Sequence, residues 1–452
     1  MSPVWLAVNY RRKKRSQEHA AADRHNSGGS GRAPLDHPLV QPGKAEVVET
    51  PAALDALIAD VRTHAVIAYD TEFIGEESFY PKLCLVQVAT PTSIALVDPV
   101  PLAAAGRDLS ELFRAIAEPG RTILVHSGET DIDILRRGAG AEPSAVFDTQ
   151  VAAALAWMPW PSSLGTVLET LTGYRLGKAH TFTNWDARPL TPAQLGYAAD
   201  DVRYMHLIWS ELSARLSSLG RADWAMSESR EQLRSGAFDP DGQLRRLHRS
   251  EPLRPGQMLV ARELVMLRYE LAKSHDLPAR VVLPDAAVIE LCKRKPTDRG
   301  AIAAVAGIPR RISAAHADDI SAAITRAKGA APESEPANPL ADDMRVRAEG
   351  DQLWSALQAR CAATGLAANL VATRSVFSRW FLASVEARRA GRFLGCTEGE
   401  NAMFQSEDWR HAAVGRWIDG FLRGEERLEL EWSPSGMVAP GFVRPGAVAS
   451  GG

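Results

Sequence analysis

The chain has 452 residues, enough for about three domains of the usual size of about 150 residues. Its 52 basic and 55 acidic residues leave a formal charge of −3, which excludes a polybasic protein and restricts any nucleic-acid contact to local basic patches. The apolar share is 45%, and no apolar run approaches the roughly 20 residues that a bilayer span needs, so we expect no membrane association.

The four cysteines lie far apart and form no C-x-x-C pair: Cys84, Cys292, Cys361 and Cys396. We therefore expect neither a disulfide scaffold nor a thiolate zinc site, and a reducing cytoplasmic location fits best. Residues 1–44 are polar, rich in Gly and Ser, and carry the basic run 11–15, which no apolar stretch follows. They predict a disordered tail and not a secretory signal; for the basic run, solvation and weak RNA contact both stay open.

Residues 45–220 predict an α/β domain. We expect strands over 66–73, 83–89, 94–98 and 122–126. Helices are expected over 129–137, from Ser162-Ser163 to Gly173, and over 195–212. Strands that come first and helices that follow indicate a sheet flanked by helices.

The remainder predicts helices with one short strand, over 428–432. We divide it into a connector (221–257), a helical unit (258–328), a linker (329–344), a second helical unit (345–440) and a disordered tail (441–452). Leu277, Val282 and Val288 recur as Leu366, Val371 and Phe377 at identical spacing. A degenerate internal repeat and a coincidence between helical segments both stay open.

Acidic residues in three separate segments carry the chemical signal. Asp70 and Glu72 point to one face of a strand, where a divalent cation would offset their repulsion. Asp131 falls in the first turn of a helix, a position that by itself indicates only capping. On the helix 195–212, Asp201 lies at the edge of the apolar stripe on the side of Tyr197, whereas Asp200 faces water. Together these segments predict a two-metal phosphodiesterase centre that holds Mg²⁺ or Mn²⁺.

The same residues resemble a known family. Asp70-Thr71-Glu72-Phe73, the segment 126–131 and Tyr197-x-x-x-Asp201 match, in order, the motifs of the ribonuclease D group, the tyrosine-bearing branch of the DEDD 3′→5′ exonucleases. The stretches 82–87, 147–150 and 185–190 are also similar to this group. The resemblance implies an RNase H-like fold, with Asp70, Glu72, Asp131 and Asp201 as metal ligands and Tyr197 orienting or helping to deprotonate the attacking water. It also implies that Phe73 and Gln87 contact the terminal nucleotide, whereas His126 could equally be a packed strand-end residue.

The unit 258–328 resembles an HRDC domain, a small helical bundle, and the unit 345–440 a divergent second copy. The first unit holds 12 Lys and Arg against 8 Asp and Glu, an excess that favours phosphate contacts. The candidate residues are Lys293, Arg294, Lys295, Arg310 and Arg311; a solvated face stays the alternative.

The whole pattern predicts an α/β RNase H-like exonuclease domain followed by all-α HRDC-type bundles. The resemblance implies an exoribonuclease that removes 3′-terminal nucleotides, releases nucleoside 5′-monophosphates and acts in tRNA 3′ processing. Its partner would be the 3′ end of RNA, with tRNA precursors as the expected substrate and without an organic cofactor. A 3′→5′ DNA exonuclease is the alternative enzyme. A non-catalytic RNA-binding protein is the other alternative, although none of the five core positions is substituted.

Overall fold

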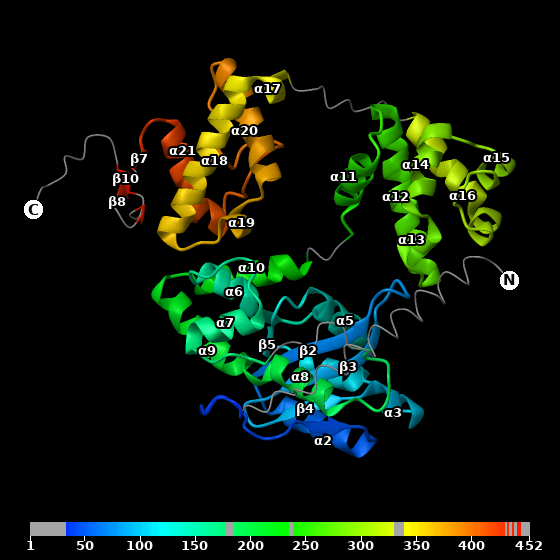
Figure 1. Cartoon of the computed structure of the whole chain (residues 1–452), viewed down its shortest axis with the longest axis vertical. Coiled ribbons are helices and arrows are strands. Elements are labelled where there is room, and N and C mark those ends of the chain that lie inside the picture. The colour runs from blue at the N-terminus through cyan, green and yellow to red at the C-terminus, as the bar shows by residue number, and fades with distance from the viewer. Residues whose placement is uncertain are drawn as a thin grey trace, which may run out of the picture.

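The computed structural model describes residues 33–177, 184–234, 238–329 and 339–429, with short strand pieces at 432–433, 436–437 and 441–443. Three bodies make up these residues (Figure 1). We call them the α/β domain (33–234), the first helical unit (238–329) and the second helical unit (339–429). Most of the predicted tail 1–44 lies outside the described residues.

A six-stranded mixed sheet forms the centre of the α/β domain, in the order β1-β4-β3-β2-β5-β6. The strands are β1 (Glu46–Val48), β4 (Ile94–Val97), β3 (Lys82–Ala89), β2 (Val66–Ile74), β5 (Thr122–Val125) and β6 (Ala145–Asp148). β3 runs antiparallel to β2 and β4, whereas β2, β5 and β6 are mutually parallel. The four predicted strands are present; β1 and β6 are additional and have only three and four residues.

Helices cover both faces of this sheet. The side chains of β2 alternate between the two faces and therefore contribute to two separate cores. Ile67 and Tyr69 join the core under α2 (Pro51–Arg62), α4 (Ser110–Ile116) and α5 (Glu129–Ala139). Ala68 joins the core under α6 (Thr149–Leu155), α8 (Pro192–Arg203) and α9 (Met205–Ser218). The helices α3 (Pro99–Ala104), α7 (Leu164–Thr172) and α10 (Ala222–Arg234) complete the domain.

Two predictions for this domain need correction. The helix expected over 195–212 is two helices, α8 and α9, which meet at Tyr204; the apolar spacing runs across the junction and therefore does not reveal it. Residues 33–44, expected as part of a disordered tail, pack against the domain. Val40 is only 3% exposed, and the Arg203 guanidinium donates to the carbonyls of Gln41 and Gly43.

The first helical unit contains α11 (Pro240–Ser250), α12 (Pro255–His275), α13 (Ala279–Val282), α14 (Asp285–Arg294), α15 (Arg299–Ala303) and α16 (Arg310–Gly329). Its buried residues form a core of their own. The segment 221–257 is not a separate connector as expected. Leu244 and Leu247 of α11 belong to the core of this unit, while α10 lies against β6 and α6 of the α/β domain.

The second helical unit contains α17 (Pro339–Asp342), α18 (Met344–Thr364), α19 (Ala368–Val371), α20 (Arg374–Arg389), the π-helical turn η2 (His411–Gly415) and α21 (Arg416–Leu422). Its first helices repeat the first unit at a constant offset. α18, α19 and α20 begin at 344, 368 and 374, each 89 residues after the starts of α12, α13 and α14 at 255, 279 and 285. This constant offset favours the repeat over a coincidence.

The chain after α21 forms short strands, and the prediction of a disordered tail over 441–452 is wrong for its first residues. β10 (Gly441–Val443) pairs antiparallel with β7 (Arg427–Glu429), and β8 (Trp432–Ser433) with β9 (Gly436–Met437). Among the described residues, no helix combines the length and the hydropathy that crossing a membrane requires.

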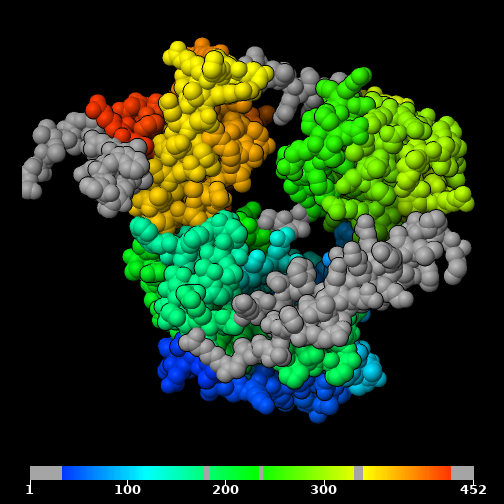
Figure 2. Space-filling model, viewed as in Figure 1, coloured from blue at the N-terminus to red at the C-terminus, as the bar shows by residue number. Residues whose placement is uncertain are grey.

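The two helical units contact the α/β domain differently. The second unit, yellow to orange in Figure 2, rests on the α/β domain, and an opening separates it from the green first unit. One continuous core cluster contains both Leu155 and Val202 of the α/β domain and Leu357 and Phe377 of the second unit. The first unit contributes nothing to that cluster.

Candidate active site

Strand β2 carries two carboxylates, Asp70 and Glu72, in its second half. Asp70 pairs with Gln87 of β3, and the pairing with β3 shifts between Glu72 and Phe73. Because side chains alternate along a strand, Asp70 and Glu72 share one face. The shift marks a β-bulge, an irregularity that is frequent beside active sites because it redirects side chains.

Helix α8 brings the third carboxylate to this face. Its start is fixed by Pro192 in the first turn and by a reciprocal capping box, in which the Thr191 hydroxyl accepts from the Gln194 N–H at 3.2 Å and the Gln194 side chain accepts from the Thr191 N–H at 2.8 Å. One turn separates Tyr197 from Asp201, so both lie on the side of the helix that faces β2.

Oxygen atoms of Asp70, Glu72 and Asp201 lie within 4.8 Å of one another. Burial is the largest cause of a raised pKa in all three carboxyls, and the neighbouring negative charges raise each pKa further. The pKa of Glu72 rises to about 8, and those of Asp70 and Asp201 rise well above their ordinary values. A cation at this position would remove the repulsion that raises them.

Asp200, the neighbour of Asp201, points elsewhere and has a structural contact. Its carboxylate accepts from the Arg203 guanidinium at 2.9 Å, and its side chain is only 27% exposed. The expectation that Asp200 faces water is therefore wrong, because Arg203 is held against the N-terminal segment and draws Asp200 to it. The choice of Asp201 as the residue facing Asp70 agrees with the geometry.

Asp131 lies beside the three-carboxylate cluster, on α5. Its carboxylate accepts from the Thr71 hydroxyl, so the residue between Asp70 and Glu72 reaches it. Burial raises the pKa of Asp131 to about 6, although the Thr71 hydrogen bond opposes this increase. The first turn of α5 therefore does more than cap the helix, because it brings a fourth carboxyl near enough for its charge to raise the pKa of Asp70 and Glu72.

A tight turn before α5 sets the position of Asp131. Ser127 adopts a left-handed conformation with φ 58°, and a Cβ on Gly128 would lie 2.5 Å from the Cβ of Val125. The buried Asp148 carboxylate accepts from the backbone N–H groups of Ser127 at 3.1 Å and Gly128 at 3.2 Å. Sequence reasoning gave Asp148 no role, although it lies in the family-like stretch 147–150.

Tyr197 lies beside the Asp201 carboxylate and packs against Trp185, whose ring centroid is 6.1 Å away. Burial and the charges of Asp201, Glu72 and Asp70 raise the pKa of its hydroxyl above the ordinary value. Tyr197 is consequently a neutral phenol at physiological pH, with an O–H group available as a donor.

Arg188 is a second residue whose role sequence reasoning missed. Its guanidinium forms a bidentate pair with the buried Asp98 at 2.5 and 2.8 Å and donates to the Cys84 carbonyl at 2.9 Å. These contacts attach the loop before α8 to β3 and to the end of β4. The family-like stretch 185–190 contains Arg188, but only the fold reveals its partner.

The donor set fits a hard divalent cation. Oxygen atoms of Asp70, Glu72 and Asp201 converge, and oxygen is the ligand that Mg²⁺ and Mn²⁺ prefer. Among the described residues, Asp201 Oδ2 and both amide atoms of Gln87 are buried without a hydrogen-bond partner. Cations with their bound water would supply the missing partners for such atoms.

The three remaining candidates in this domain differ in their surroundings. Gln87 is fully buried and lies directly opposite Asp70 in the β2–β3 pairing, so its side chain is on the same face of the sheet as Asp70. His126 uses both ring nitrogens within the protein, against the Thr149 hydroxyl at 2.9 Å and the Ser162 carbonyl at 3.0 Å, and burial lowers its pKa. These contacts favour the packed strand-end alternative. Phe73 is half-buried and packs on the core under α5.

The basic candidates lie on the first helical unit, at the end of α14 and the start of α16, and not with the carboxylates. Lys293 pairs with Glu251 and Glu290, and Arg294 pairs with Glu290 at 3.1 Å. Lys295 donates to the Gly256 carbonyl at 2.8 Å. Within the described part of the chain, exposed Arg310 and Arg311 form no ion pair and are therefore the two most available for phosphate.

The comparisons with known proteins agree with this geometry. A family model described as "3′-5′ exonuclease" matches residues 45–217, and an HRDC domain model matches residues 257–324. The chain is 31% identical over 378 residues to ribonuclease D of Acidiphilium cryptum, covering 82% of this chain and 93% of that protein. It is 33% identical over 285 residues to ribonuclease D of Nitrobacter hamburgensis, covering 62% and 73%.

Solved structures show the same fold. The crystal structure of Escherichia coli RNase D superposes with a TM-score of 0.66 at 24% identity and covers 84% of this chain and 99% of its own. A protein from Bifidobacterium adolescentis superposes with a TM-score of 0.56 at 22% identity, covering 86% and 99%. The chain therefore belongs to the ribonuclease D family and is a 3′-5′ exoribonuclease.

Proposed function

We propose that the chain removes 3′-terminal nucleotides by two-metal-ion hydrolysis, with Asp70, Glu72, Asp131 and Asp201 holding two Mg²⁺ or Mn²⁺ ions. The observation that carries this proposal is the convergence of carboxylate oxygens of Asp70, Glu72 and Asp201 within 4.8 Å, with the pKa of each of these three carboxyls raised and with Asp131 beside them. Two such ions supply an activated water and stabilise the attacking and leaving oxygens of the phosphodiester.

Tyr197 then orients the attacking water. Its hydroxyl is protonated because the adjacent carboxylates and burial raise its pKa, so it acts as a hydrogen-bond donor and not as the base. Attack on the last phosphodiester bond leaves the phosphate on the departing nucleotide, which is released as a nucleoside 5′-monophosphate. Arg188 holds the loop before α8 and thereby the orientation of Tyr197 and Asp201.

We propose the 3′ ends of structured RNA, tRNA precursors first, as the substrate. Hydrolysis directed at the backbone accepts many sequences, so selection must come from shape and from single-stranded ends. The first helical unit offers Arg310 and Arg311 for phosphate contacts beyond the cleavage site. The E. coli protein of the same fold is described as an exoribonuclease involved in structured RNA processing.

Cleavage by the full chain tests the carboxylate assignment. A 5′-labelled tRNA with a 3′ extension and a matched single-stranded DNA are followed on gels with Mg²⁺ or with EDTA. The wild-type protein should produce a ladder on RNA that EDTA abolishes. Asp201→Asn should lose cleavage, whereas Asp200→Asn should retain it because asparagine still offers an oxygen to Arg203. Equal activity of the two variants would contradict the assignment, and a ladder on DNA alone would favour the DNA exonuclease.

Binding tests the arginine assignment separately. Arg310→Ala and Arg311→Ala should each weaken binding of the tRNA precursor and reduce the salt dependence by about one phosphate contact. Arg299→Ala is the matched control, because Arg299 is equally basic but already paired with Asp318. If Arg299→Ala weakens binding as much as Arg310→Ala and Arg311→Ala do, then the start of α16 has no specific role in binding RNA.

A further inference from the structure

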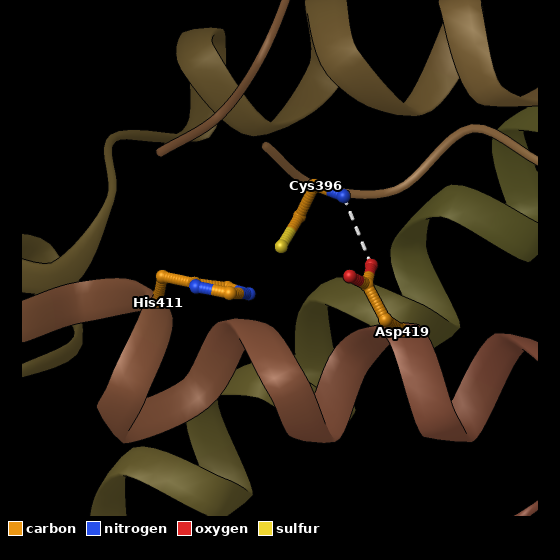
Figure 3. Close-up of side chains that lie close together, drawn as sticks. All are labelled: Cys396, His411 and Asp419. Atoms are coloured by element: carbon orange, nitrogen blue, oxygen red, sulfur yellow. Dashed lines mark hydrogen bonds between the residues drawn. The ribbon is translucent and has the colours of Figure 1, made fainter. Parts of the chain in front are cut away.

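A second group of metal-ligating side chains lies far from the exonuclease site, in the second helical unit. Cys396 lies in the segment between α20 and η2, His411 begins η2, and Asp419 lies on α21. The Cys396 sulfur, a His411 ring nitrogen and an Asp419 oxygen all lie within 4.8 Å of one another. Figure 3 shows the three side chains pointing into one common space.

The His411 ring is oriented as in a metal site. Its Nδ1 lies 3.0 Å from the Ser406 carbonyl, a group that only accepts, so Nδ1 carries the proton and donates it. The other ring nitrogen, Nε2, is consequently the one with a free lone pair. A backbone carbonyl that fixes the tautomer in this way is the usual support of a metal-bound histidine.

The π-helical turn aligns His411 with Asp419. In an ordinary α-helix, two turns take about seven residues, and residues eight apart diverge around the axis. A π turn contains one extra residue, so positions separated by eight come onto the same face. The irregular geometry of His411–Gly415 thus places the imidazole and the carboxylate on the side that faces Cys396.

A glycine keeps the space between these groups open. A Cβ on Gly415 would lie 2.6 Å from His411 Cδ2 and 2.9 Å from the Cys396 sulfur. Neither distance is compatible with an alanine in the present arrangement, because both are well inside ordinary van der Waals contact. Because residue 415 has no side chain, the space between His411 and Cys396 stays open, and both could bind one ion placed there.

The surroundings favour a cation over a reactive thiol. Cys396 is fully buried, so a substrate cannot reach its sulfur. The Asp419 carboxylate accepts from the Cys396 backbone N–H at 2.9 Å, which turns it toward the sulfur. The Glu398 carboxylate adds negative charge nearby and accepts from the Gly395 N–H at 3.2 Å.

We propose that Cys396, His411 and Asp419 form a zinc site that the exonuclease chemistry does not use. Sulfur, imidazole nitrogen and carboxylate oxygen are the donors that Zn²⁺ takes, at about 2.0–2.3 Å in a tetrahedral arrangement. The ligand atoms, which lie within 4.8 Å of one another, would draw together to reach these bond lengths. Binding releases the thiol proton to solvent, and three protein ligands leave the fourth position to water.

Such an ion would connect the segment 390–410 to the last helices of the chain. The present contacts within this segment include hydrogen bonds from the Met403 and Phe404 N–H groups to the Cys396 carbonyl at 2.8 and 3.1 Å, and the ion would add a bond from Cys396 itself to the last helices. The competing explanation is a buried thiol that merely donates a hydrogen bond to Asp419. The two explanations differ in whether a metal ever bonds to the sulfur.

Cobalt substitution of the full chain distinguishes them. Wild-type protein stripped with chelator and titrated with Co²⁺ should develop the near-ultraviolet absorption of a cobalt–thiolate bond, and Zn²⁺ should abolish it. The exonuclease carboxylates do not produce this absorption, because they contain no sulfur ligand. Absence of the band in the wild-type protein would overturn the proposal, whatever the variants do.

Variants assign the band to the site. Cys396→Ser and His411→Gln should lose it, together with the thermal stabilisation that Zn²⁺ confers on the wild-type protein. Cys361→Ser is the matched control, because Cys361 is an equally buried cysteine of the same unit outside the cluster; it should retain both. A band that persists in Cys396→Ser would place the thiolate elsewhere and overturn the proposal. If Cys396→Ser fails to fold, His411→Gln gives the same assignment.

Discussion

The two helical units repeat one plan of helices but meet the α/β domain in different ways. In both, the residue after the first long helix is left-handed: Asp276 after α12, with φ 47°, and Gly365 after α18, with φ 66°. These equivalent positions, 89 residues apart, both touch the α/β domain. The two units can therefore be compared by the contacts that surround the same position in each repeat.

Around Asp276 the contact is small. Its carboxylate accepts from the Tyr80 N–H at 2.9 Å, and the Phe79 ring meets Tyr269 edge-on at a centroid distance of 5.4 Å. The buried residues of the first unit's core all belong to that unit, and Phe79 packs against this core from the α/β domain. A few contacts of this kind hold a domain in place without being needed for its folding.

Around Gly365 the contact is extensive and buried. The Arg221 guanidinium donates to the carbonyls of Leu155 at 2.7 Å, Gly365 at 3.3 Å and Thr364, so it connects both bodies. Glu228 of α10, only 1% exposed, pairs with Arg410 at 2.6 Å and accepts from the Trp409 indole at 2.9 Å. The second unit and the α/β domain therefore behave as one folding body, and the first unit as a module attached to it.

Deleting one or both helical units should produce the largest difference in stability between the two units' roles. A chain that ends at residue 234 loses both helical units and exposes the α/β side of the shared core, so we expect it to aggregate. A chain in which a Gly/Ser linker replaces residues 238–329 keeps that core and should unfold cooperatively in urea, followed by circular dichroism. A stable, cooperative fold of the shorter chain would refute the single folding body.

Glu228→Ala should destabilise the joint body by about 3 kcal/mol, because it leaves Arg410 only Asp408 as an acidic partner and removes the buried acceptor of the Trp409 indole. Urea unfolding measured by tryptophan fluorescence reports this loss. Asp318→Ala breaks an exposed pair with Arg299 in the first unit and should cost at most about 1 kcal/mol. Similar losses for the two variants would mean that the buried pair is not part of a shared core.

Gly365→Ala should cause the next largest loss of stability. An alanine there would adopt an unfavourable left-handed backbone conformation, and its Cβ would also clash with Trp157. A Cβ there would lie 2.0 Å from Trp157 Cδ2. Gly391 is the matched control, with φ 70° and open space around it. The control Gly391→Ala should cost about 1–2 kcal/mol for the left-handed conformation alone, and Gly365→Ala about 1–3 kcal/mol more for the overpacking. Equal losses in urea unfolding would exclude close packing at Trp157.

The smallest effect is expected at the corresponding position of the first unit. Asp276→Gly retains the left-handed cap and removes only the acceptor for Tyr80, so the free energy of unfolding should fall by about 1 kcal/mol or less. The radius of gyration from small-angle X-ray scattering should increase as the module separates. Asp276→Asn keeps an oxygen acceptor and should leave both quantities unchanged; a larger radius for this control would point to charge and not to the hydrogen bond.

Local signals in the sequence predicted much of the exonuclease domain. The strand that carries Asp70 and Glu72, the helix that starts at the Ser163 cap and ends at left-handed Gly173, and the choice of Asp201 over Asp200 all depend on alternation, capping or helical spacing. Such features depend on residues within about two turns or one strand of each other, so they are visible without the fold.

Other features were decided only by the tertiary structure. The short strands β1 and β6, the membership of α11 in the first unit and the burial of Glu228 all depend on partners far away in the chain. The absence of a C-x-x-C pair argued against a thiolate zinc site, yet Cys396 meets His411 and Asp419 only after a loop and a π turn bring them together. Sequence patterns record periodicity along the chain, whereas shared cores and ligand clusters depend on distances between segments, which only packing establishes.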